Sequence, residues 1–250
     1  MARAITFDVT RTLIHSPRLV GIYAEVLGRH GIPAPPAEVA RLLPVVWQEL
    51  DCRAEIGRDR FAAHPGGARG WWRRYVERLV ELLGGPPPGP FAAAELYHRF
   101  GEPAAWEVYP EVPATLAELA RMGLKLAVVS NWDARLPPLL GRLGLGERFA
   151  AVVYSSDVGV EKPDPRIFHA ALDRLGVAPH EAVHVGDSVH EDVEGALAAG
   201  IEPLHLVRPG AVSYLRREPP AAGRGDLADL APLPELVAIT RFPAPFGLPG

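Results

Sequence analysis

Three aspartates and one lysine are spaced so that they could form one polar site. Asp8 and Asp187 each follow a short apolar run, Asp192 lies five residues beyond Asp187, and Lys162 lies in a polar loop. Carboxylates that are held close together cannot all ionise unless positive charge compensates them, and one lysine is too little for three. A hard divalent cation with oxygen ligands is the usual compensation, and a site with few carboxylates and remaining waters favours magnesium.

A serine and an asparagine extend this pattern toward phosphate chemistry. Ser130 and Asn131 follow a third apolar run, where a hydroxyl and backbone amides could hold a phosphate at the start of a helix. Lys162 would then neutralise the charge on a transferring group. Asp8 would be left to act as a nucleophile, as carboxylates do in aspartyl-phosphate chemistry.

These side chains must be positioned by strands that alternate with helices. The apolar runs predict buried strands at residues 4–7, 124–129, 149–154, 182–185 and 201–207. Helical spacing follows in the intervals, at residues 113–122, 136–143, 166–175 and 189–199. This alternation is typical of parallel β-α-β units, so we expect an α/β fold with a doubly wound parallel sheet. Ligands bind beyond the carboxyl ends of the strands in such sheets, which is where the polar side chains fall.

The alternation is interrupted by a long segment in which apolar residues recur at helical spacing and no convincing strand occurs. We therefore expect a core formed by residues 1–15 and 108–240, with a helical insertion at residues 16–107. The proline-rich residues 241–250 are expected to form an irregular tail. Trp71 and Trp72, in the insertion, fit core packing and a homodimer interface equally well.

Composition excludes several classes of protein. The chain has 26 Lys and Arg against 30 Asp and Glu, a net charge of −4, which argues against a nucleic-acid or membrane-surface partner. Cys52 is the only cysteine, so an internal disulfide and a cysteine-based zinc site are excluded. No signal sequence precedes the first strand and no run is long enough to span a membrane, so we expect a cytoplasmic protein.

The order of the polar motifs resembles that of the haloacid dehalogenase (HAD) superfamily. The motifs that carry the resemblance are Asp8-Val9-Thr10-Arg11-Thr12, Ser130-Asn131, Lys162-Pro163 and Gly186-Asp187-Ser188-Val189-His190-Glu191-Asp192, the last of the form GDxxxxD. Each motif alone is weak, but four in this order at strand ends is a strong signal. The resemblance implies a Rossmann-like core, and the helical insertion resembles the family's C1-type cap, which closes over the substrate.

The resemblance also implies a magnesium site. In this family Asp8 would be both the nucleophile and a metal ligand, and Thr10 would give its backbone carbonyl to the metal. Asp187 would be a direct ligand, and Asp192 would ligate the ion or orient a water bound to it.

A phosphoryl-binding set follows from the same resemblance. Ser130, the Asn131 amide and Lys162 would bind the phosphoryl group of a small phosphorylated metabolite, which is the substrate class we expect. Hydrolysis would pass through an aspartyl-phosphate intermediate on Asp8.

Thr10 departs from the family pattern. Phosphatases of the superfamily carry an aspartate at this position, which acts as general acid and then base, whereas a threonine hydroxyl does not ionise near neutral pH. General acid–base help is typically worth about 10²–10⁴ in rate, so Thr10 should weaken phosphomonoesterase activity. His15 and His190 are the candidate substitutes. At Arg11 the superfamily often has glycine, and this guanidinium is expected to pair with substrate or to reach solvent.

Three functions are compatible with the sequence. The first is a magnesium-dependent phosphatase, weak or narrowly specific. The second is a dehalogenase-like hydrolase, a branch that also lacks the second aspartate but whose chemistry needs no metal, and against which the GDxxxxD motif speaks. The third is a catalytically degenerate protein that binds a phosphorylated ligand, which Thr10 favours and the retained Asp8, Lys162, Asp187 and Asp192 oppose.

Overall fold

The structure is a computed structural model that describes residues 2–51, 57–87, 89–209 and 227–239. Cys52 and the expected tail at 241–250 lie outside the described residues. Among the described residues the chain forms two compact units, one from residues up to 14 and from 108 onward, and one from residues 15–107. None of the helices in the described ranges combines the length and the hydrophobicity that crossing a membrane requires.

The first unit is built on a five-stranded sheet, and all of its strands are parallel. The strands are β1 (Ala4–Phe7), β4 (Lys125–Ser130), β5 (Ala151–Tyr154), β6 (Ala182–Gly186) and β7 (Glu202–His205). Their order across the sheet is β5-β4-β1-β6-β7, so β1 is the central strand. The chain first adds β4 and β5 on one side of β1 and then adds β6 and β7 on the other side. All five strands predicted from the apolar runs are confirmed, with ends that differ by two residues at most.

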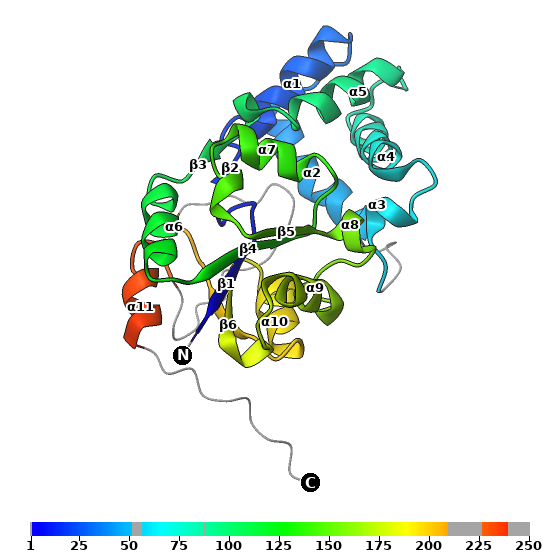
Figure 1. The fold of residues 1–250 in the computed structure, drawn as a ribbon. Coiled ribbons are helices and arrows are strands. Elements are labelled where there is room, and N and C mark those ends of the chain that lie inside the picture. Colours follow the sequence, from blue (N-terminus) through cyan, green and yellow to red (C-terminus); the bar gives the residue numbers. More distant parts are fainter. Residues whose placement is uncertain (1, 52–56, 88, 210–226, 240–250) are drawn as a thin grey trace. The chain divides into compact units, whose positions relative to one another are not determined.

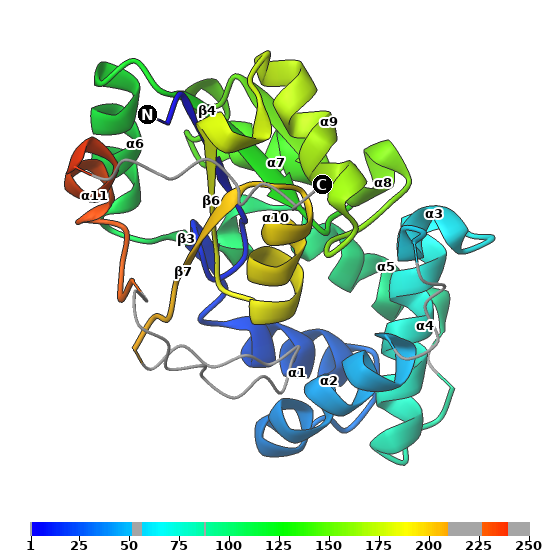
Figure 2. The same cartoon turned by 90° about the horizontal axis from the view of Figure 1, so that it is seen from below.

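Helices cover both faces of this sheet (Figure 1; Figure 2). The helices of this unit are α6 (Val112–Arg121), α7 (Leu136–Arg142), α8 (Ser155–Val158), α9 (Pro165–Leu175), α10 (Gly195–Ala198) and α11 (Leu233–Ile239). Strand residues alternate between the faces, so Ala127 and Val129 of β4 join the apolar cluster formed with α9, while Val128 points the other way. The sheet is therefore a buried central layer, as a parallel sheet must be.

The predicted helix at residues 189–199 is only partly correct. A π-helical turn covers Val189–Glu194, and a regular α-helix follows only from Gly195. The backbone amide of Val193 bonds Ser188 O five residues back, at 3.2 Å. This wider turn carries Asp192 back over the strand end that precedes it, and π-helical turns of this kind are frequent at functional sites.

The second unit is helical. It contains α1 (Leu19–Arg29), α2 (Pro36–Asp51), α3 (Arg60–Ala63), α4 (Gly67–Leu82) and α5 (Pro90–Arg99). Its core is rich in aromatic rings, and Trp71 lies 5.5 Å from Trp47 and 4.8 Å from Trp72, centroid to centroid. Trp71 is therefore a core residue of this unit. The two-residue strands β2 (Ile14–His15) and β3 (Glu107–Val108) lie where the chain passes from one unit to the other.

Candidate active site

The carboxyl ends of three neighbouring strands bring the predicted site residues together. Phe7, the last residue of β1, is in register with Val128 of β4 and with Val185 of β6. The Asp8 amide continues the ladder by donating to Val185 O at 2.9 Å. Asp8 therefore emerges at the centre of the sheet edge, where ligands bind in folds of this kind.

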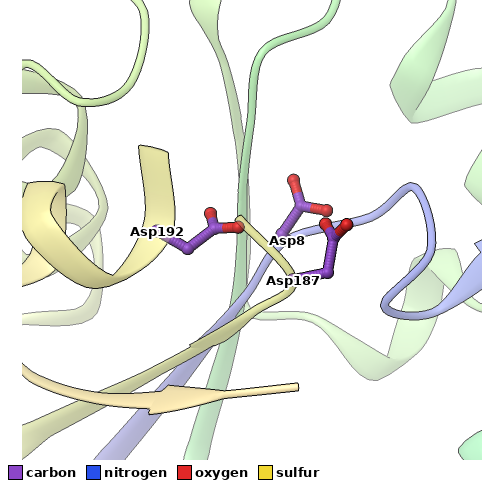
Figure 3. A group of neighbouring side chains, drawn as sticks. All are labelled: Asp8, Asp187 and Asp192. Carbon is purple, nitrogen blue, oxygen red and sulfur yellow. The ribbon is translucent and has the colours of Figure 1, made fainter. Parts of the chain in front are cut away.

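The three aspartates form one cluster (Figure 3). A carboxylate oxygen from each of Asp8, Asp187 and Asp192 lies within 4.8 Å of the other two. Asp8 and Asp192 are buried, and Asp187 is half-buried. A set made only of carboxylate oxygens fits a hard divalent cation such as magnesium, and it does not fit a soft metal that prefers sulfur or nitrogen.

Lys162 joins two of these carboxylates. Its side chain is fully buried, and Nζ lies 2.7 Å from Asp8 Oδ1 and 2.5 Å from Asp192 Oδ1. Burial by itself lowers the pKa of Lys162, but the charges of Asp192 and Asp8 outweigh that effect and raise the pKa above its ordinary value. Lys162 is therefore a fixed positive charge at neutral pH.

Asp192 is almost saturated with hydrogen-bond donors. Oδ1 accepts from Lys162 and from His184 Nε2, at 2.5 and 3.1 Å, and Oδ2 accepts from the Ser188 amide at 2.9 Å. Burial alone would raise the pKa of Asp192, but Lys162 and His184 lower it, so the group is ionised. A carboxylate offers about four lone-pair positions, so about one remains on Asp192. Asp192 therefore has little capacity left to ligate a cation directly, should one bind here.

A glycine makes room for this carboxylate. A Cβ atom at Gly186 would lie 2.2 Å from Asp192 Cγ, which no side chain can tolerate. Gly186 therefore has a direct steric function in the GDxxxxD motif, because it lets the π-helical turn bring Asp192 against the end of β6.

His184 is a buried member of the site that sequence reasoning missed. Its Nδ1 atom lies 2.8 Å from the Thr6 hydroxyl and its Nε2 atom 3.1 Å from Asp192 Oδ1. Burial lowers the pKa of His184, more than the hydrogen bond and charge of Asp192 raise it. The ring is therefore neutral, with Nε2–H donating to Asp192 and Nδ1 accepting from Thr6. A lone histidine within an apolar strand offers no sequence signal that distinguishes it from a core residue.

The predicted phosphoryl-binding residues also lie at this edge. The Ser130 hydroxyl donates to Asp8 Oδ1 at 3.1 Å. The side-chain amide of Asn131 makes two hydrogen bonds to the backbone of Lys162, at 2.7 and 3.0 Å. Asn131 therefore holds the loop that carries Lys162, a function that the sequence did not indicate.

The Thr10 hydroxyl accepts a hydrogen bond from a neighbouring side chain. The indole Nε1–H of Trp132 donates to Thr10 Oγ1 at 3.2 Å. One lone pair of the hydroxyl is therefore used, and its own hydrogen stays available for donation. The pairing holds the side chain in place but supplies no ionisable group.

His190, one of the two candidate substitute histidines, does not join the carboxylate cluster. His190 is exposed and bonds Glu194 on its own turn, at 2.8 Å. His15 belongs to the helical unit, and its Nε2 atom lies 3.8 Å from Glu107. The Arg11 guanidinium pairs with Asp187, with Nη1 2.9 Å from Oδ2, and its side chain is partly exposed; its pairing with substrate stays a prediction.

Comparison with known proteins identifies the family. The chain matches the model of the haloacid dehalogenase-like hydrolase family over residues 2–200, and it belongs to that family. It is 35% identical over 210 residues to haloacid dehalogenase-like hydrolase domain-containing protein 3 of Bos taurus, covering 83% of this chain and 82% of the relative. It is also 36% identical over 213 residues to a glyceraldehyde 3-phosphate phosphatase of Methanopyrus kandleri, covering 83% and 85%.

A solved structure with the same fold is named for a reaction other than that of the Methanopyrus kandleri phosphatase. The 2-haloacid dehalogenase of Pseudomonas syringae pv. Tomato DC3000 superposes with a TM-score of 0.64 at 25% identity, covering 95% of this chain and 99% of that one. The chain is thus a HAD-type hydrolase with a Rossmann-like parallel sheet. Because similar proteins include a phosphatase and a dehalogenase, the residues of the site must distinguish the two reactions.

Proposed function

We propose that the chain is a magnesium-dependent phosphatase that acts on a small phosphorylated metabolite through Asp8. The observation that carries the proposal is the cluster of Asp8, Asp187 and Asp192, whose oxygens lie within 4.8 Å of one another. A carboxylate nucleophile that displaces halide needs no cation, so that reaction does not require a cluster of carboxylates that could hold one. The phosphatase named among the relatives points the same way.

The cation would be held by few protein atoms. Asp8, Asp187 and the Thr10 carbonyl are the ligands we assign, and Asp192 would orient a water of the ion. A bound magnesium ion would neutralise charge on the phosphoryl oxygens and so reduce their repulsion of Asp8. Lys162, already fixed against Asp8, would neutralise a further oxygen.

The reaction then has two balanced steps. An Asp8 carboxylate oxygen attacks phosphorus, a phosphorus–oxygen bond forms, and the bond from phosphorus to the leaving oxygen breaks. The leaving oxygen takes a proton from water. Water next attacks phosphorus and loses a proton to the solvent, the bond from phosphorus to the Asp8 oxygen breaks, inorganic phosphate departs and the Asp8 carboxylate is regenerated. Because Thr10 donates no ionisable proton, leaving groups that depart without protonation should react fastest.

The helical unit would act as a C1-type cap. Its size and its insertion directly after the first motif support this assignment, and a cap of this kind excludes water and selects the substrate. Homodimer formation and a cytoplasmic location stay predictions of the sequence.

The choice between the reactions can be tested with two substrates. An aryl phosphate, which has a good leaving group, should release phosphate with magnesium present and should cease to do so when the cation is chelated. Halide release from a 2-haloacid without metal would instead establish that the protein is a dehalogenase. Tight binding of a phosphate mimic without turnover of either substrate would establish that it is a catalytically degenerate protein that binds a phosphorylated ligand.

A further inference from the structure

Arg11 occupies an unusual backbone position beside the carboxylate cluster. Its φ angle is 69°, and no other non-glycine residue in the described part of the chain has a positive φ. An arginine in the left-handed region is disfavoured, so the surroundings must hold it there. They do so from both sides: the Arg11 amide donates to Ile14 O at 2.7 Å, and Arg208 donates to Arg11 O at 3.1 Å.

Arg208 is itself fixed in place. Its guanidinium donates to Thr12 O at 2.8 Å and to Glu111 at 2.6 Å, and its side chain is only 7% exposed. The turn after Asp8 is therefore clamped in a conformation that aims the Arg11 side chain at the sheet edge.

The Arg11 guanidinium ends on a carboxylate of the cluster. Nη1 lies 2.9 Å from Asp187 Oδ2, with side-chain exposures of 27% and 12%, and Nε is a buried atom. Lys162 already pairs with Asp8 and Asp192. Each of the three carboxylates thus has a basic partner within the protein, and the five groups carry a net charge of −1.

We propose that Arg11 is a built-in counter-ion that competes with the divalent cation for Asp187 and thereby weakens cation binding. The inference rests on the proposed metal site. A cation that binds Asp187 must displace the guanidinium or accept its repulsion at close range, and either cost reduces affinity. In return, Arg11 compensates the negative charge of the cluster when no cation is bound, which reduces the repulsion between the carboxylates and helps to keep them in place.

The test is the affinity of the full-length protein for Mg²⁺, measured by titration calorimetry without substrate. Arg11→Asn removes the charge with a residue that tolerates positive φ, so the turn is preserved. We expect it to bind Mg²⁺ roughly tenfold more tightly than the wild type, a coupling typical of neighbouring charges. Arg11→Lys keeps the charge and should bind nearly as the wild type does. Arg3→Gln is the matched control, because it removes the same charge from an exposed pair with Glu181 at the opposite end of β1.

Denaturant unfolding gives a second readout. With chelator present, Arg11→Asn should be less stable than the wild type, and added Mg²⁺ should stabilise it more. Equal or weaker Mg²⁺ binding by Arg11→Asn would overturn the proposal, because it would mean that Arg11 only positions Asp187. If the wild type and both Arg11 variants fail to bind Mg²⁺, the metal site itself is wrong and this inference falls with it. If the wild type binds Mg²⁺ and Arg11→Asn binds it with the same affinity, only the proposed competition between Arg11 and the cation is refuted. The phosphatase proposal then still stands.

Discussion

Lys162 Nζ lies 2.7 Å from Asp8 Oδ1, so the proposed nucleophile is in direct contact with a buried ammonium group. Because Lys162 also bonds Asp192, Lys162→Met would leave two buried carboxylates without their positive partner. Breaking a buried ion pair in this way typically costs about 3–5 kcal/mol. We expect the free energy of unfolding, measured by urea titration in chelator, to fall by about that amount and phosphate release to fall at least about 100-fold.

Lys125→Met provides the matched control for this substitution. Lys125 lies at the start of β4 and donates to the Leu175 carbonyl at 2.5 Å, where a single hydrogen bond is worth about 1 kcal/mol. Its phosphate release should stay near that of the wild type. If both methionine variants lost activity equally, the special function of Lys162 would be refuted.

Gly186→Ala should disable the site through Asp192. The added Cβ would lie 2.2 Å from Asp192 Cγ and 2.3 Å from Oδ2, so the carboxylate must leave its bonds to Lys162 and His184. We expect phosphate release to fall at least about tenfold and Mg²⁺ affinity to fall with it. Gly141→Ala, on α7, is the control, because a methyl group added there would meet nothing within 4 Å. Unchanged activity in Gly186→Ala would contradict the packing described for the motif.

His184 should make stability depend on pH below neutrality. Burial holds the pKa of His184 below the ordinary 6.5. As the pH drops through that value, this histidine binds a proton in the unfolded chain but stays neutral in the folded protein. The free energy of unfolding should therefore fall as the pH drops below about 6.5, by up to about 1.4 kcal/mol per pH unit from this group. Urea titrations at several pH values between 7 and 5 should show that the free energy of unfolding of His184→Gln changes less with pH than that of the wild type. If both proteins lost stability equally over this pH range, His184 would not contribute to the pH dependence.

Thr10→Asp should restore a general acid. The threonine hydroxyl accepts from Trp132 at 3.2 Å and cannot protonate a leaving alkoxide. An aspartate should raise kcat/KM for alkyl phosphates by about 10²-fold, within the range typical of general acid–base help, and change aryl phosphates far less. The comparison of the two substrate classes is the measurement. An equal change for both would show that proton donation does not limit the wild-type reaction.

The sequence predicted the fold and most of the site for one physical reason. Asp8 and Asp187 each end an apolar run, and the carboxyl ends of parallel strands share one edge of the sheet, so their convergence follows from the pattern. His184 could not be found in this way, because its partners Thr6 and Asp192 are set by strand register and by the π-helical turn. Helical periodicity does not distinguish that turn from a regular helix.

Arg11 shows a second limit of sequence reasoning. Its side-chain direction depends on a positive φ that the sequence would assign to a glycine or an asparagine. That conformation is stabilised by Arg208, which is almost 200 residues away in the chain. Contacts of such separation leave no local pattern, so the pairing of Arg11 with Asp187 emerges only from the three-dimensional structure.

The central claim is that Asp8 attacks phosphorus with the help of a divalent cation. Its most direct test is phosphate release from an aryl phosphate by Asp8→Asn at saturating Mg²⁺, with thermal unfolding to verify that the variant is folded. Asparagine keeps the shape of the side chain and removes the nucleophilic oxygen. We expect activity to fall at least about 10³-fold while the wild type stays active only with Mg²⁺. Magnesium-dependent phosphate release by Asp8→Asn at a rate close to that of the wild type would contradict the claim.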